Sequence, residues 1–306
     1  MKNIEISVVI PVYNSESILP ELYSQLKTTL DKLAVNYEVI FCEDCGNDNS
    51  WAVLTELKEK DPGIITAVKL SKNYGQHSAT MCGLTFARGE IVITMDDDLQ
   101  HSPGEIVKLL DAYKRSDADV IYGDFQVKQH SKIRNAGSYS IKKTSKFFRQ
   151  GKGKGSSFRL ISRSIIDKIL LHHQYFVFID KLIFWYTDNI EFVQVEHHKR
   201  VGSKSTYSRS KLFHLFSNLM FFYTTFPLKL MVYGGMIISF ITFLMGVNAI
   251  LKKIFFNIQL GYTSIIVAIL FSTSIIIFSL GLIGEYLSRM YQIQNQRPPF
   301  NIKKVL

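Results

Sequence analysis

The chain has 306 residues, a formal net charge of +10 and 47% hydrophobic residues. This length allows one large domain or two smaller ones, and the positive charge suits phosphorylated ligands, anionic lipid or nucleic acid. Three cysteines are too few for a disulfide framework, and the short apolar run at the amino terminus lacks the cleavage site of a signal peptide. We therefore expect a reduced, cytosolic first domain.

Strand-like and helix-like stretches alternate through the first part of the chain. Apolar runs rich in β-branched residues lie at 4–10, 37–41, 64–70, 91–95 and 119–122, and helix-like stretches lie between them at about 15–33, 49–60, 76–88 and 103–115. This alternation predicts an α/β fold, with a mainly parallel sheet and helices on both faces. Ligands of such sheets bind beyond the carboxyl ends of the strands.

Polar residues follow four of the predicted strands, at the edge where a ligand is expected. They are Tyr13 and Asn14, Glu43 and Asp44, Asn73, and Asp96 to Gln100. The spacing Cys42-x-x-Cys45 formally matches a redox motif, but Cys42 ends an apolar strand and we favour a structural role.

Three adjacent acids, Asp96, Asp97 and Asp98, follow the apolar run 91–93. Buried unpaired anions are costly, and Mg²⁺ and Mn²⁺ prefer oxygen ligands, so the acids predict a metal site. Because side chains alternate across a strand, we expect Asp96 and Asp98 on one face and Asp97 on the other. A solvated acidic turn is the alternative.

The stretch 128–172 is rich in lysine and arginine and contains Gly151, Gly153 and Gly155, which indicate a flexible loop. It is either a binding surface for an anion or a solvated helix face.

Two long apolar segments, at about 228–251 and 262–287, are each longer than the ~20 residues that cross a bilayer. Their short connection predicts a hairpin, and the flanking lysines and arginines favour cytosolic ends; two apolar core helices are the alternative. The segment before them is amphipathic and suits the headgroup layer. The predicted organisation is a cytosolic domain at 1–207, an interfacial helix at 208–227, the transmembrane hairpin at 228–288 and a cytosolic tail at 289–306.

Six motifs occur in order along nearly the whole chain. They are Ser7-Val-Val-Ile-Pro-Val-Tyr-Asn14, Glu43-Asp44, Asn73-Tyr-Gly-Gln-His-Ser-Ala79, Asp96-Asp-Asp-Leu-Gln100, Arg200…Lys204-Ser-Thr-Tyr207 and Gly281-Leu-Ile-Gly-Glu-Tyr286. Together they resemble the family 2 glycosyltransferases of the GT-A fold, and in particular those that act on polyprenyl phosphates. The stretch 73–79 is most similar to the branch that transfers 4-deoxy-4-formamido-L-arabinose.

The resemblance implies inverting transfer of a sugar from a nucleotide sugar, expected to be a UDP-sugar, to polyprenyl (undecaprenyl) phosphate. It implies an integral protein of the inner membrane with its catalytic domain in the cytosol, acting in envelope glycan or lipopolysaccharide modification. Mg²⁺ or Mn²⁺ is the implied cofactor, and a homo-oligomer, plausibly a tetramer, is the implied assembly. The chain lacks a nucleic-acid-binding signature, so no nucleic-acid partner is expected.

The resemblance also assigns residues. For the nucleotide sugar it implies Pro11, Tyr13, Glu16, Asp44, Asn73, Gly75 and Asp97. For the metal it implies Asp96, Asp98 and Gln100, and for the acceptor phosphate Arg134, Ser138, Arg200 and, more loosely, Lys128. The residues expected to be catalytic are Asp96, Asp98, Arg134 and Arg200.

One departure and two alternatives remain. Many relatives place an aspartate two residues before an arginine in a Gly-Asp-aromatic-Arg stretch, whereas this chain has Ser157 before Arg159. The alternatives are a polysaccharide synthase, whose Gln-x-x-Arg-Trp motif is missing from the sequence, and a non-catalytic nucleotide-sugar-binding membrane protein. The histidines match no zinc spacing; those considered were His77, His101, His197 and His198.

Overall fold

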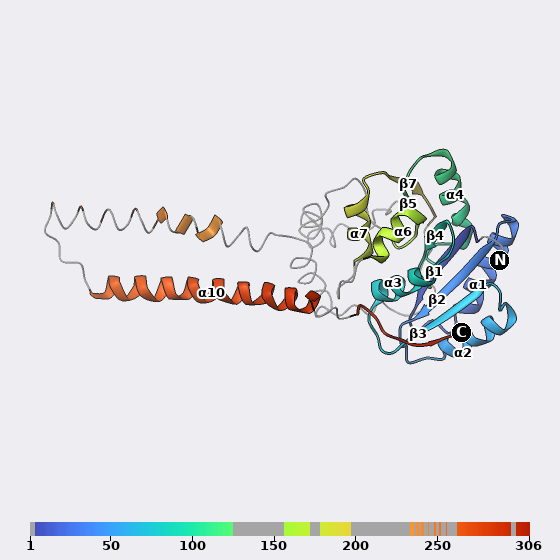
Figure 1. Ribbon diagram of the computed structural model, residues 1–306, viewed down its shortest axis with the longest axis horizontal. Coiled ribbons are helices and arrows are strands. Elements are labelled where there is room, and N and C mark those ends of the chain that lie inside the picture. The colour runs from blue at the N-terminus through green and yellow to red at the C-terminus, as the bar shows by residue number, and fades with distance from the viewer. Residues whose placement is uncertain are drawn as a thin grey trace, which may run out of the picture. The chain divides into compact units, whose positions relative to one another are not determined.

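Figure 1 shows the computed structural model, which describes residues 4–124, 156–171, 178–196, 262–294 and 298–306, with scattered residues between 233 and 255. By its internal contacts the chain divides into two units. The first comprises residues 1–204 together with 298–306, and the second comprises residues 205–297. The predicted acceptor-phosphate residues lie outside the described residues; they are Lys128, Arg134, Ser138 and Arg200.

The first unit alternates strands and helices in the predicted order. Its elements are β1 (Ile6–Val12), α1 (Leu19–Lys32), β2 (Tyr37–Glu43), α2 (Ser50–Lys60), β3 (Ile65–Leu70), α3 (Gln76–Phe86), β4 (Ile91–Thr94), η1 (Pro103–Glu105), α4 (Ile106–Arg115), β5 (Val120–Asp124), β6 (Arg159–Ser162), α6 (Arg163–Leu170), α7 (Ile179–Tyr186), β7 (Ile190–Gln194) and β8 (Ile302–Val305). The strands and helices predicted up to β5 are confirmed, with boundaries shifted by a few residues. The later strands and helices of this unit were not predicted.

The strands form one eight-stranded sheet in the order β7-β5-β6-β4-β1-β2-β3-β8. The four central strands β4, β1, β2 and β3 are parallel to one another. Strand β6 is antiparallel to β4 and β5, and β8 is antiparallel to β3. The carboxyl ends of the four central strands therefore meet at one edge of the sheet, as the α/β prediction requires.

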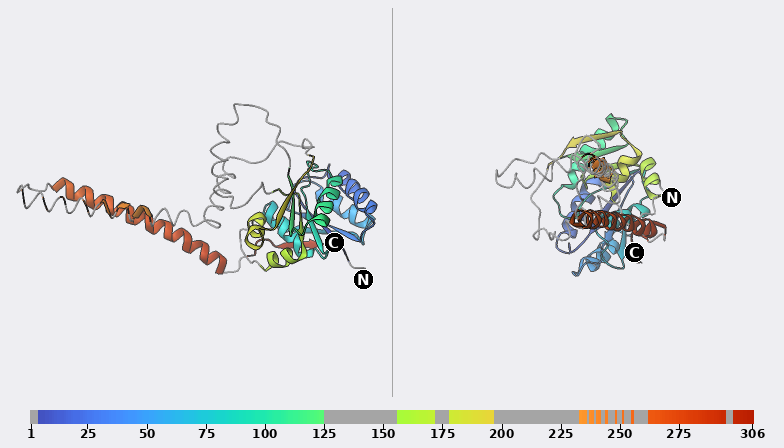
Figure 2. Two further views of the ribbon diagram at one scale, coloured as in Figure 1. Left: turned by 90° about the horizontal axis from the view of Figure 1, so that it is seen from above. Right: turned by 90° about the vertical axis from the view of Figure 1, so that its left-hand side faces the viewer.

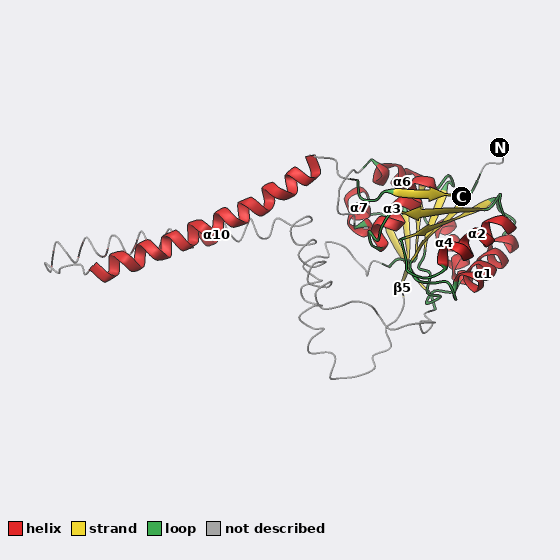
Figure 3. Ribbon diagram, turned by 90° about the horizontal axis from the view of Figure 1, so that it is seen from below, coloured by secondary structure: helices red, strands yellow, loops and turns green. Residues whose placement is uncertain are grey.

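Helices cover both faces of this sheet. Residues of α1, α2 and α4 pack with Val8 and Phe41 on one face, and residues of α3, α6 and α7 pack with Val9 and Ile40 on the other. Figures 2 and 3 show α3, α6 and α7 on one side of the strands and α1, α2 and α4 on the opposite side. Every residue of β1 is buried, which is typical of a parallel strand covered on both faces.

The second unit contains α10 (Tyr262–Gln294). Within the part of the chain that the structure describes, one stretch, Phe271–Ser288, is long and apolar enough to cross a membrane, and none of it is buried. Large apolar side chains such as Ile277 and Phe278 are more than half exposed, at 64% and 68%. An apolar surface of this kind suits lipid rather than water. The helix begins where the second apolar segment was predicted and continues past residue 287, while most of the first segment, 228–251, lies outside the described residues.

Candidate active site

Backbone and side-chain hydrogen bonds join the loops that follow the central strands. After β1, the N–H of Tyr13 donates to Oδ2 of Asp97, which follows β4, at 3.0 Å. After β3, the N–H of Tyr74 donates to Oδ1 of Asp44, which follows β2, at 2.7 Å. Gln76, which follows β3, donates to Asp96, which follows β4, and so links these two pairs of loops into one site.

Asp44 fixes the loop between β3 and α3. Its Oδ1 accepts from the N–H of Tyr74, and its Oδ2 accepts from the N–H of Gly75 at 2.7 Å. Gly75 has φ +92°, a conformation that favours glycine. Burial raises the pKa of Asp44 to about 6, although the two N–H donors act in the opposite direction.

We expect this loop to loosen as the pH falls through about 6, the pKa of Asp44. The N–H donors of Tyr74 and Gly75 lower this pKa, so losing them while Asp44 stays buried would raise it further, and protonation therefore favours the loosened loop. A protonated carboxyl keeps one good acceptor, so one of the two amides loses its partner, at a cost of about 1 kcal/mol or a fivefold loss of protection. Hydrogen exchange at Tyr74 and Gly75, corrected for intrinsic rates, measures this change. Asp44→Asn is the control, because its protection should not respond to pH. Unchanged protection in the native protein across this pH range would contradict the prediction.

The three acids lie beyond β4 rather than in it. The strand ends at Thr94 and Leu99 has φ 54°, so the expected alternation of Asp96 and Asp98 across a strand is wrong. Asp97 nevertheless points away from Asp96. Its Oδ2 accepts from Oγ of Ser15 at 2.5 Å as well as from Tyr13, so it holds the loop after β1.

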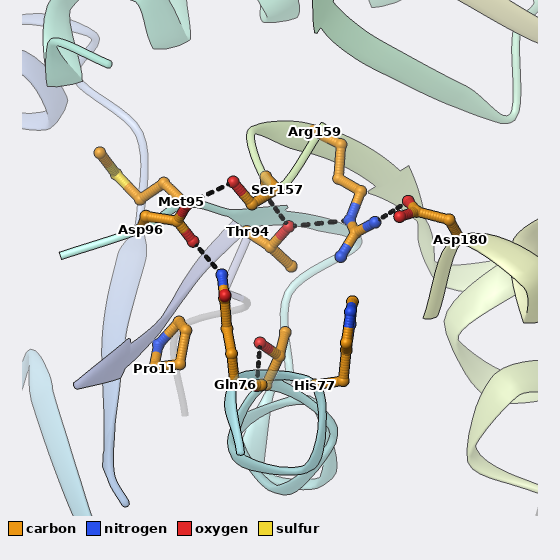
Figure 4. A pocket seen from close by; sticks show the side chains of 10 residues that line it. Pro11, Gln76, His77, Thr94, Met95, Asp96, Ser157, Arg159 and Asp180 are labelled. Carbon is orange, nitrogen blue, oxygen red and sulfur yellow. Dashed lines mark hydrogen bonds and ion pairs between the residues drawn. The ribbon is translucent and has the colours of Figure 1, made fainter. Parts of the chain in front are cut away.

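Asp96 points into a cavity of about 170 Å³ between α3, β4, β6 and α7. Its Oδ2 accepts from Oγ of Ser157 at 2.6 Å, and its Oδ1 accepts from Nε2 of Gln76. Figure 4 shows Asp96 between these two side chains. Burial raises the pKa of Asp96 to about 6, and the charges of Asp98 and Asp97 add to the shift.

This arrangement fits a divalent cation. Burial raises the pKa of both Asp96 and Asp97, and the charge of Asp98 adds to each shift; a cation bound beside these carboxylates would oppose both effects. Asp98 is 8% exposed, and its Oδ1 accepts from the backbone N–H of Gln100 at 3.1 Å. Among the described residues, no three His, Cys, Asp or Glu side chains form a metal-binding group. Asp96 and Asp98 would thus leave several positions to water and ligand oxygens, as is usual for Mg²⁺.

A buried arginine, which the sequence analysis did not assign to the site, forms the far wall of the cavity. Arg159 is 2% exposed, and its Nε donates to Oγ1 of Thr94 at 3.0 Å. Its guanidinium forms an ion pair with Asp180, which also accepts from the hydroxyl of Tyr122 at 2.9 Å. Figure 4 shows Arg159 between Thr94 and Asp180, with His77 pointing toward it. Burial lowers the pKa of His77 to about 4, and the charge of Arg159 acts in the same direction, so this imidazole is neutral.

The other predicted ligand residues lie around this site in different roles. Pro11 lines the cavity, and Tyr13 is 42% exposed. Glu16 joins the loop after β1 to α2, because its Oε2 accepts from the N–H of Asn49 at 2.7 Å. Asn73 is exposed in the loop that Asp44 fixes.

Comparison with known proteins adds two family matches. A model described as Glycosyl transferase family 2 matches residues 7–170, and a model described as the GtrB C-terminal hairpin matches residues 226–290.

Curated relatives match over nearly the whole chain. An undecaprenyl-phosphate 4-deoxy-4-formamido-L-arabinose transferase of Klebsiella pneumoniae (strain 342) is 33% identical over 310 aligned positions, which cover 99% of this chain and 94% of the relative. The enzyme of the same description from Proteus mirabilis (strain HI4320) is 34% identical over 307 positions, with the same coverage. Among solved structures, S. aureus TarS 1–349 in complex with UDP-GlcNAc aligns with 71% of this chain and 66% of that chain, at 18% identity and a TM-score of 0.47.

Proposed function

The chain belongs to glycosyl transferase family 2, and from this membership we propose that it transfers a sugar from a nucleotide sugar to undecaprenyl phosphate. The observation that supports the proposal best is the position of Asp96, a partly buried carboxylate in a cavity at the carboxyl ends of the central strands. The mainly parallel sheet with helices on both faces is the GT-A architecture expected for this family.

We propose that the donor lies across the ends of β1, β2 and β3. Tyr13 is exposed, and its aromatic ring is a group on which a base can stack. Asp44 supports the site by fixing the backbone at Tyr74 and Gly75, which leaves the other lone pairs of its carboxylate for a base N–H such as that of uracil. The other residues assigned to the nucleotide sugar are Pro11, Glu16, Asn73 and Asp97. A UDP-sugar is the proposed donor.

The sugar of the donor is assigned to the cavity beside Asp96. At about 170 Å³, this cavity is smaller than the roughly 300–1,000 Å³ typical of whole-ligand pockets, so it suits one end of a larger ligand. Mg²⁺ or Mn²⁺ held by Asp96 and Asp98, with Gln100 beside them, would neutralise charge on the departing nucleoside diphosphate. Ser157 and Gln76 orient Asp96 through the hydrogen bonds that it accepts.

The acceptor phosphate needs to be aligned with the donor more than it needs a general base. A phosphate monoester has a second pKa of about 6, so its oxygen is already anionic near neutral pH and can attack the anomeric carbon directly. The reaction therefore needs no general base at position 157, which explains how Ser157 can stand where relatives have an aspartate. The hydroxyl of Ser157 instead donates a hydrogen bond to Asp96. We assign the acceptor phosphate to Arg134, Ser138, Arg200 and Lys128, because arginine forms paired hydrogen bonds with phosphate.

The membrane location follows from the second unit. The hairpin family over residues 226–290 and the exposed apolar surface of α10 identify a membrane protein. We propose that it resides in the inner membrane with residues 1–207 in the cytosol, where nucleotide sugars are available, and that it assembles as a homo-oligomer, plausibly a tetramer.

A transfer assay tests this function. The full-length protein in detergent is incubated with radiolabelled UDP- or GDP-sugars, undecaprenyl phosphate and Mn²⁺. We expect label in the lipid phase for a UDP-sugar, and we expect EDTA to abolish it and added Mn²⁺ to restore it. Label that stays water-soluble for every donor would overturn the proposed function, and transfer that persists in EDTA would overturn the metal assignment alone.

A further inference from the structure

The last residues of the chain return to the sheet of the first unit. Strand β8 pairs antiparallel with β3, and Val305 lies opposite Val68. Leu306 donates its N–H to the carbonyl of Ala67 at 2.9 Å and accepts the N–H of Ala67 at 3.3 Å. Figure 1 shows this segment in dark red alongside β3. The carboxyl terminus is therefore an integral edge of the sheet.

The same segment contacts the base of the donor loop, residues 71–77. The N–H of Ser71, the first residue after β3, donates to the carbonyl of Asn301 at 2.9 Å. Phe300 and Ile302 cover a small apolar cluster beneath this loop, and Tyr74 of the loop packs on the same cluster. Its buried members come from β2, β3 and α3: Cys42, Val68, Leu70, Ala79 and Cys82.

The donor loop itself bears residues of the site. Tyr74 and Gly75 donate to Asp44, while Gln76 donates to Asp96 and His77 lines the cavity. Two kinds of contact therefore hold the same few residues. Phe300 and Ile302 pack on the cluster on which Tyr74 also packs, and Asp44 accepts the backbone N–H groups of the loop. A loop with two such anchors loses less entropy when a ligand binds, because it is already ordered.

We propose that Phe300 and Ile302 are positioning residues for the donor site. The effect that we expect on the KM for the donor rests on the proposed function.

The test compares variants of the full-length protein with substitutions in one short segment. Phe300→Ala and the milder Ile302→Ala remove apolar support, Phe300→Leu restores most of it, and Lys303→Ala changes an exposed side chain of the same strand. For Phe300→Ala we expect the Kd for UDP and the KM for the donor to rise about tenfold, with kcat changed less than twofold. Hydrogen exchange in residues 71–77 should quicken by a similar factor, and Cys82 should become reactive toward a thiol reagent. Phe300→Leu and Lys303→Ala should resemble the native protein.

The outcomes separate this inference from the proposed function. If the native protein transfers no sugar, the function fails, while exchange in residues 71–77 still reports on the support of the loop. If Phe300→Ala and Ile302→Ala lower the melting temperature but leave UDP binding and exchange in residues 71–77 native, then β8 only protects the edge of β3 and the inference is overturned. If Phe300→Ala does not fold, Ile302→Ala decides by the same measurements.

Discussion

Replacing Asp96 with asparagine should lower kcat about 10³-fold while the protein remains folded. The substitution keeps the size of the side chain and an acceptor for Ser157, but it removes the charge that would hold a cation. Metal stabilisation of a leaving group is worth several kcal/mol, and each ~1.4 kcal/mol is a factor of ten in rate. The melting temperature should stay the same or rise, because burial of this carboxylate is unfavourable, as its raised pKa indicates.

The matched control is Asp111→Asn, an exposed acid on α4 far along the chain from the site. It should transfer sugar at the native rate. The measurement is the initial rate of label transfer at saturating donor over a range of Mn²⁺ concentrations. A variant of Asp96 with at least a tenth of native kcat at every Mn²⁺ concentration would contradict the assigned role.

Replacing Arg159 with methionine should destabilise the protein by about 3–5 kcal/mol, the usual cost of removing one partner of a buried ion pair. Arg159 is 2% and Asp180 15% exposed on their side chains, so neither charge is well solvated. Without the guanidinium, Asp180 keeps only the hydroxyl of Tyr122 among the hydrogen bonds described above. The substitution should also abolish transfer, because it changes the wall of the cavity.

The double variant Arg159→Met with Asp180→Leu distinguishes pairing from packing. Removing both charges should recover much of the lost stability, since no buried charge is left alone. Asp167→Asn is the control, because it breaks the exposed Arg163–Asp167 pair at 3.5 Å and should cost less than about 0.5 kcal/mol. Denaturant unfolding followed by fluorescence measures each value. A double variant no more stable than Arg159→Met would show that packing, rather than the charge pair, accounts for the loss.

The sequence predicted the central strands because their signals are local. Each is a largely apolar run with β-branched residues, and the polar residues after β1, β2, β3 and β4 identified the edge where the site lies. Strands β6 and β8 were not predicted because their residues do not show that pattern. Strand β6 begins with Arg159 and lies in a basic stretch, and β8 contains Lys303 and Lys304 in four residues. Pairing of β6 with β4 and β5, and of β8 with β3, makes them strands.

The same reasoning separates the site residues that were predicted from those that were missed. Asp44 and Asp96 each follow a strand of the predicted parallel sheet. Because the carboxyl ends of such strands meet at one edge, the order of the elements was enough to predict that the two residues lie at the same site. Arg159 was matched to the arginine of the Gly-Asp-aromatic-Arg stretch but was given no role in the site. Asp180 was not considered, because the pairing of these two residues depends on an antiparallel strand and a helix far apart in sequence. Burial of a charge is a property of the folded chain, and no local pattern in the sequence reveals it.

The return of residues 298–306 to the sheet also restricts how the chain can be threaded through a bilayer. Strands β1 and β8 belong to one sheet, so the polypeptide must leave and re-enter the same aqueous compartment. The number of crossings between them is then even, and a single crossing by α10 requires a second.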